Sequence, residues 1–250
     1  MSISRPNQGV TYSPAKKVYT IKSGSVHCYD RLTKESYQVK NISGIVLESD
    51  VIRLDGFSSK RQQYLKSNYF RNGYRGQITI KDSNGLSVHT GSYVSDADVD
   101  LFKSFYDKSP RVRILYFYMA TKSNPKGGEV IELQLKGSGI SAFLEGKEDK
   151  RNVDGCSISL KGFEDKSKGS VSWKQPIFEF KELDKSIDFV NEMWNKAAEL
   201  DTELQKWIDS LDETIPRRTN PTQTYQESEI TEDEYESEEE VEGTQDDLPF

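Results

Sequence analysis

The sequence predicts a mainly β protein with α-helical additions. Between residues 37 and 180, seven runs rich in Val, Ile and aromatic residues are separated by Gly, Asn, Asp and Pro. Two short segments with a helical pattern interrupt these runs, and a long one follows them. Beyond residue 213 apolar residues are too scarce to offset the entropy of ordering, so residues 214–250 are expected to be a disordered acidic tail.

The N-terminal segment, residues 1–35, is polar and contains Pro6 and Pro14. We expect an arm there that can include one short strand. The β-rich body follows, over residues 36–182.

The clearest unit of the body is a hairpin from Arg111 to Lys136, with "TKSNPKGGE" as its turn. In the second strand apolar and polar residues alternate, which predicts one apolar face and one face open to water. The apolar set is Ile131, Leu133 and Leu135, and the polar set is Glu132, Gln134 and Lys136.

The two short helical segments are "DADVDLFKSFYDK", with Asp96 or Asp98 as its N-cap, and "SGISAFLEGKEDK". Residues 183–213 carry apolar residues at steps of three and four, which predicts an amphipathic helix or helix pair. Such a helix can pack on the body or serve in dimerisation or partner binding. Its apolar stripe comprises Ile187, Val190, Trp194, Ala197, Leu204, Ile208 and Leu211.

Charge is divided unevenly along the chain. The net charge is −7, but residues 219–250 hold twelve of the 41 acidic residues and none of the 34 basic ones. Residues 1–218 therefore carry a net charge of +5. This division favours an anionic partner for the body and a basic partner for the tail.

The sequence lacks the motifs of common enzyme classes. There is no phosphate-binding loop, dinucleotide fingerprint, zinc-protease motif or nucleophile elbow, so we expect a protein that is not an enzyme and needs no cofactor. Cys28 and Cys156 lie far apart with only two histidines in the chain, which argues against a metal site. Without a leader or membrane-spanning run, a cytoplasmic protein that does not bind membranes is expected.

One stretch interleaves cations with aromatic residues, as single-stranded nucleic acid requires. Cations neutralise phosphates, and unpaired bases stack on aromatic faces for about 1–3 kcal/mol each with little sequence preference. The alternative is that several of the aromatics are core residues and the cations a solvated face. The candidate binding residues are Arg53, Phe57, Lys60, Arg61, Tyr64, Lys66, Tyr69, Phe70, Arg71, Tyr74 and Arg75.

Further binding candidates lie outside that stretch. In "RVRILYFYMATK" a strand would place Arg111 and Arg113 on one face and Tyr116 and Tyr118 on the other, so only one pair can meet a ligand. Trp173, beside Lys174, is another stacking candidate. Core packing is the alternative for each of these residues.

The sequence closes with "DDLPF" after the acidic "ESEITEDEYESEEEVEGTQ". This segment resembles the tail of single-stranded-DNA-binding proteins of bacteria and their phages, which carry acidic residues, a hydrophobic residue, proline and a terminal phenylalanine. The resemblance implies that the tip, Asp246, Asp247, Leu248, Pro249 and Phe250, docks on replication and recombination proteins such as polymerase, helicase, primase or nuclease. It also implies an OB-fold-like barrel elaborated by insertions, the form more similar to phage-encoded members.

Together these features predict a sequence-tolerant single-stranded-DNA-binding protein of a phage, acting in DNA replication, recombination and repair. Its oligomeric state stays open, homo-oligomers included. One alternative is an RNA-binding protein or RNA chaperone. Another is a structural virion or scaffold protein whose acidic tail only confers solubility.

Overall fold

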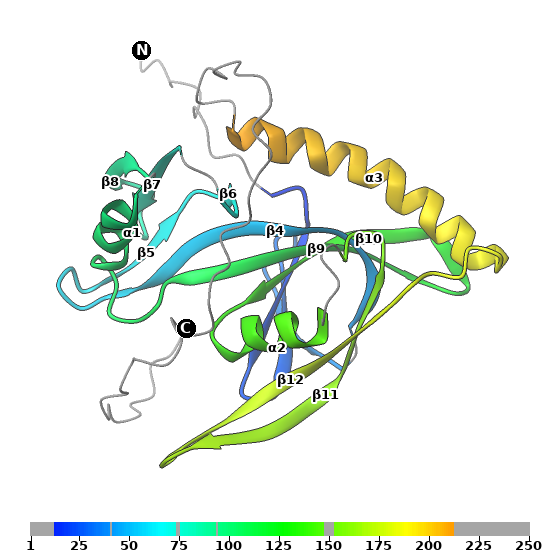
Figure 1. Cartoon of the computed structure of the whole chain (residues 1–250). Helices are drawn as coiled ribbons and strands as arrows, with labels where there is room; N and C mark the ends of the chain where they lie inside the picture. Colours follow the sequence, from blue (N-terminus) through cyan, green and yellow to red (C-terminus); the bar gives the residue numbers. More distant parts are fainter. Residues whose placement is uncertain (1–12, 41, 74–75, 94, 148–152, 213–250) are drawn as a thin grey trace. The chain divides into compact units, whose positions relative to one another are not determined.

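The structure, a computed structural model, describes residues 13–40, 42–73, 76–93, 95–147 and 153–212 (Figure 1). Strands dominate these residues and three helices accompany them, so the mainly β fold with α additions is confirmed. The helices are α1 (Asp96–Lys103), α2 (Ser138–Lys147) and α3 (Asp188–Asp212). The strands are β1 (Lys17–Lys22), β2 (Ser25–Asp30), β3 (Ser36–Val39), β4 (Ser43–Ser58), β5 (Gln63–Ser67), β6 (Phe70–Arg71), β7 (Gln77–Lys81), β8 (Ser87–Ser92), β9 (Arg111–Thr121), β10 (Asn124–Leu135), β11 (Ser157–Lys168) and β12 (Val171–Lys181).

The strands form one extended sheet in the order β3-β2-β1-β10-β9-β4-β5-β7-β8. Strand β1 runs parallel to β10, whereas β9 is antiparallel to both β10 and β4. The hairpin expected from Arg111 to Lys136 is therefore confirmed as β9–β10. A second long hairpin, β11–β12, joins the sheet where β11 pairs with the beginning of β4. Within the described residues the path from β3 to β8 is open and forms no closed barrel.

Helices cover different parts of this sheet. Helix α3 lies over one face of β4, β9 and β10, and α2 lies with β12 on the other side (Figure 1). Helix α1 covers a third core formed by the far half of β4 with β5 and β7. The sixteen-residue strand β4 connects the two ends of the sheet, because Ile45–Leu54 pair with β9 and the last four residues pair with β5.

The N-terminal region differs from the expected arm. Strands β1 and β2 lie inside the sheet, and Tyr19, Val26 and Cys28 are buried in the core shared with α2. The arm prediction is therefore wrong for residues 17–30. The alternation of apolar and polar residues in "SVHCYD" was a strand signal that the surrounding lysines concealed.

The helices follow their sequence patterns closely. Helix α1 begins after Ser95, which forms a capping box with Asp98, so the N-cap is Ser95 and neither Asp96 nor Asp98, the two expected positions. Residues 188–212 form a single helix, and Ala197, Leu204 and Ile208 are buried against the sheet. Of the alternatives for this helix, packing on the body is the one observed. None of the described helices is long and apolar enough to cross a membrane.

The polar face of β10 is the main departure from expectation. It was predicted to face water, yet Glu132 is fully buried. Its carboxylate accepts hydrogen bonds from Arg31 Nη2 at 2.7 Å, Gln134 Nε2 at 2.7 Å and the Tyr69 hydroxyl at 3.1 Å. The prediction of a wet face is wrong because α3 packs over this side of β10 and the side chains of Arg31 and Tyr69 reach it, and a buried carboxylate is tolerated where donors surround it.

Candidate nucleic-acid interface

The stretch that interleaves cations and aromatics folds into the end of β4, β5 and β6. Phe57 on β4 and Tyr64 on β5 are direct cross-strand partners, with ring centroids 6.0 Å apart and planes tilted by 60°. Both side chains are exposed, Phe57 by 41% and Tyr64 by 51%. Large aromatic side chains usually bury such area, so an exposed cross-strand pair is an available stacking surface.

The turn between these strands is fixed to the segment after α1. The carboxylate of Asp107 accepts the Ser59 backbone N–H at 2.9 Å and the Ser59 hydroxyl at 2.8 Å. Asp107 in turn donates its backbone N–H to the Phe57 carbonyl. Lys60 and Arg61, at the turn, are exposed, and the guanidinium of Arg61 lies 5.7 Å from the ring centre of Phe105. Hydrogen bonds to Asp107 therefore fix the turn next to the aromatic pair.

Lysines gather on the same face of the sheet. Lys66 on β5 pairs directly with Asp55 on β4 and with Lys81 on β7, and directly paired residues project from the same face. Among the described residues neither Lys66 nor Lys81 has an ion-pair partner. The opposite face of these strands is apolar and covers the core beneath α1. Two like charges face each other here, an arrangement that costs stability without a ligand.

Lys136 joins this group from the end of β10. Its ammonium lies 3.6 Å from Asp55 Oδ1 and 3.3 Å from the Asp55 carbonyl oxygen. Burial lowers the pKa of Lys136, and the positive charges of Arg53 and Lys66 lower it further, while Asp55 opposes the change. Asp55 also pairs with Arg53, so one carboxylate meets more positive charge than it can neutralise.

The arginines predicted to bind phosphates mostly serve the fold. Arg53 is buried and donates to Asp55 at 2.6 Å, while Arg113 is buried with its guanidinium 5.2 Å from the ring centre of Phe143. Two others are partly buried and bound to neighbours: Arg71 donates to Asp209 and Gln205, and Arg111 donates to Asn72. Of the arginines predicted to bind phosphates, only Arg61 is exposed among the described residues.

Several predicted stacking residues are part of the core. Tyr116 and Tyr118 are fully buried, and Phe70 is 3% exposed. The Tyr118 hydroxyl donates to the Pro125 carbonyl at 2.8 Å, and Tyr69 is half-buried beside Trp207. For these four residues the core alternative holds. Tyr74, Arg75 and the tip residues 246–250 lie outside the described residues.

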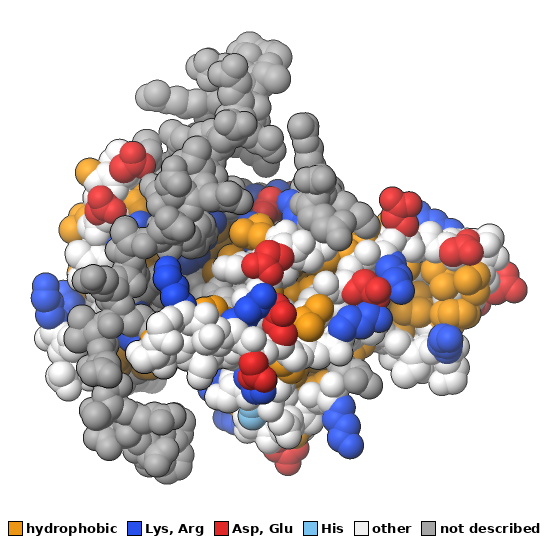
Figure 2. Space-filling view, turned by 60° about the horizontal axis from the view of Figure 1, so that its bottom comes forward, with side chains coloured by type: hydrophobic (Ala, Val, Ile, Leu, Met, Phe, Trp, Pro, Cys, Tyr) orange, Lys and Arg blue, Asp and Glu red, His pale blue; other side chains and the backbone are white. Residues whose placement is uncertain are grey.

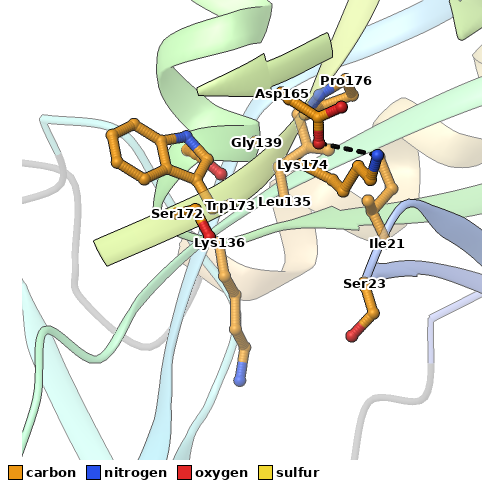
Figure 3. Close-up of a pocket in the computed structure, with 11 residues that line it drawn as sticks. Ile21, Ser23, Leu135, Lys136, Gly139, Asp165, Ser172, Trp173, Lys174 and Pro176 are labelled. Carbon is orange, nitrogen blue, oxygen red and sulfur yellow. Dashed lines mark ion pairs between the residues drawn. The ribbon is translucent and has the colours of Figure 1, made fainter. Parts of the chain in front are cut away.

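Trp173 lies apart from the core, at an open pocket of about 440 Å³ (Figure 3). It is half-buried on β12 and shares the pocket with Lys136. The structure thus brings Trp173 near the lysine group through Lys136, although these residues are far apart in sequence.

The face of α2 and the β11–β12 hairpin has no single basic patch. In Figure 2 basic side chains on this side lie among acidic and hydrophobic ones. Much of that charge is paired, as in Lys161 with Glu179 at 2.8 Å and Lys174 with Asp165 at 2.7 Å. On the β5–β7 face, by contrast, Lys66 and Lys81 are direct cross-strand partners and stand beside two exposed aromatic rings.

Sequence reasoning missed two members of the site, Lys81 and Lys136. Lys81 ends the strand "QITIK", where alternation puts it opposite the buried Ile78 and Ile80. Lys136 continues the polar alternation of β10. Both alternations can be read from the sequence, but only the three-dimensional structure shows that these two lysines lie near Lys66.

Metal-binding chemistry finds no support in the described residues. They contain no group of three or more His, Cys, Asp or Glu side chains that could hold an ion. Cys28 is buried and Cys156 half-buried, and both are free thiols.

Comparison with known proteins gives no match among family models, curated proteins or solved structures.

Proposed function

We propose that the protein binds single-stranded DNA with little sequence preference on the exposed face of β4, β5 and β7. The observation that best supports this proposal is the cross-strand pairing of Lys66 with Lys81 beside the exposed rings of Phe57 and Tyr64. Unpaired like charges attract phosphates, and the two rings offer stacking faces to bases. Duplex DNA turns its base faces inward, so the aromatic pair favours a single strand.

The fold and the tail extend this proposal. The long twisted β body is the part that we propose to be an elaborated OB-fold-like domain, which binds oligonucleotides across a strand face. The acidic segment and the tip Asp246–Phe250 would recruit replication and recombination proteins, as the resemblance to phage and bacterial single-stranded-DNA-binding proteins suggests. The setting would be the cytoplasm of a bacterial host, where the protein coats and protects single strands.

The test is a titration of fluorescently labelled oligo(dT), with duplex DNA and an RNA oligonucleotide of equal length as competitors. We expect tight binding that weakens with salt and resists competition by duplex. Displacement by equimolar duplex, or no binding at low salt, would leave the structural-protein alternative. Stronger binding of the RNA would favour the RNA-binding alternative.

A substitution series ties that binding to the proposed face. Replacing Tyr64 by Ala should weaken oligo(dT) binding by roughly five-fold to 150-fold, the range for loss of one stacked base. The control is Tyr37→Ala, since Tyr37 is similarly exposed, at 44%, but lies on the edge strand β3 at the far end of the sheet. Equal effects of the two substitutions would show that the interface is elsewhere.

A further inference from the structure

The pocket beside Trp173 is built from three parts of the chain (Figure 3). The β1–β2 turn contributes Ser23, the end of β10 and the start of α2 contribute Lys136 and Ser138, and the β11–β12 hairpin contributes Asp165 and Trp173. Leu135, Ile21 and Pro176 supply apolar wall. The pocket therefore combines an aromatic side chain, hydroxyl groups and a cation with a smaller apolar part, a mixture that suits a nucleobase with its sugar-phosphate.

The indole of Trp173 lies beside a buried side chain that is itself hydrogen-bonded to α2. Its Nε1–H lies 3.5 Å from Gln175 Oε1, and Gln175 Nε2 donates to Glu145 Oε2 on α2 at 2.8 Å. Gln175 is only 5% exposed, so this connection is fixed by the fold. A ring oriented before binding loses less entropy when a base stacks on it.

Lys136 is the cation that the pocket can offer. The ammonium of Lys174, which also lines the pocket, is occupied by Asp165 at 2.7 Å, as the dashed line in Figure 3 shows. Lys136 lies between two sites, since it lines the pocket and also reaches Asp55 on β4. Asp55 precedes Phe57 by two residues on the same strand, and thus on the same face.

We infer that the Trp173 pocket is a second base-binding subsite for the same single strand, connected to the Phe57–Tyr64 face through Lys136. The inference rests on the proposed function. The ligand is then an extended strand that spans both places, with one phosphate near Lys136. An oligonucleotide too short to span from the Phe57–Tyr64 face to the Trp173 pocket should therefore gain no affinity from Trp173.

The experiment compares oligo(dT) of about 4 and about 16 nucleotides, the limits that one OB-type site covers. Replacing Trp173 by Leu should weaken binding of the longer strand at least about five-fold and leave that of the shorter strand unchanged. The matched control is Ile177→Ala, because Ile177 is exposed at 42% on the same strand but does not line the pocket. It should bind both strands like the wild type.

Tryptophan fluorescence supplies a second readout. The longer strand should quench the wild-type emission, and the quenching should be lost in Trp173→Phe but retained in Trp194→Phe, since Trp194 belongs to α3. Tight binding of the longer strand without any change in Trp173→Leu overturns the second subsite and leaves the proposed function standing. If Trp173→Leu weakens binding of the shorter and the longer strand equally, the inference that one strand spans two subsites is overturned as well. Failure of the wild type to bind either strand refutes the proposed function itself.

Discussion

Neutralising Lys66, Lys81 and Lys136 together should change the salt dependence of DNA binding by a calculable amount. For single strands, the slope of log affinity against log salt is about −0.7 per neutralised phosphate. Replacing all three lysines by Gln should therefore reduce the slope by about 2. Between about 50 and about 200 mM salt, the wild type would lose roughly 20-fold more affinity than the variant.

Fluorescence anisotropy of labelled oligo(dT) over this salt range measures the slope directly. The matched control replaces Lys34, Lys103 and Lys206 by Gln, three exposed lysines away from the proposed face that change the net charge equally. Thermal unfolding of both triple variants checks that the folded state is kept, because Lys136→Gln removes an ion pair with the buried Asp55, whereas relief of the Lys66–Lys81 repulsion acts in the opposite direction. Equal slopes in the two triple variants would refute the reasoning, since the effect would then follow net charge alone.

Three further outcomes follow from other parts of the chain. Arg31→Met should lower the unfolding free energy by about 3 kcal/mol in urea titrations, because it leaves the fully buried Glu132 without its cation; a loss below about 1 kcal/mol would contradict this. Loss of hydration, with the nearby Glu48, raises the pKa of Asp154 to about 6. Its folded-state pKa exceeds the unfolded value, so wild-type stability should rise as pH falls from 7 to 5, and Asp154→Asn should lack that rise. Deleting residues 248–250 should abolish pull-down of host replication proteins while oligo(dT) affinity stays unchanged.

The fold was predictable wherever local pattern decides it. The β9–β10 hairpin, α2 and α3 follow from period-two and helical patterns that tertiary contacts reinforce. In β2 the alternation of "SVHCYD" is short and lies among polar and charged residues. Strand β1 was missed because "KVYTIK" is short and charged at both ends, and its pairing partner, β10, is more than 100 residues away. Pairing at that distance leaves no local signal, so a strand can look like part of a polar arm.

The site was less predictable than the fold, since interleaved cations and aromatics can serve either core or surface. Phe57 and Phe70 carry the same side chain in the same stretch, yet the first is exposed and the second is buried beneath α1. The residues around each are similarly polar, and the difference arises from which face of β4 or β6 meets α1. Only the register of the strands, which no composition shows, separates the two roles.

Several arginines are bound within the sheet while lysines remain on its surface, and the chemistry of the two side chains explains this difference. Arginine presents several donors in a rigid planar fork, so Arg31 and Arg53 can each bind two or more acceptors within the sheet. Lysine carries a compact, hydrated charge on a flexible stem, and Lys66 and Lys81 remain unpaired among the described residues. Lysines neutralise phosphates without the bidentate geometry that reads guanine, so this face should discriminate little between bases and depend strongly on salt. A protein that coats any exposed single strand needs both properties.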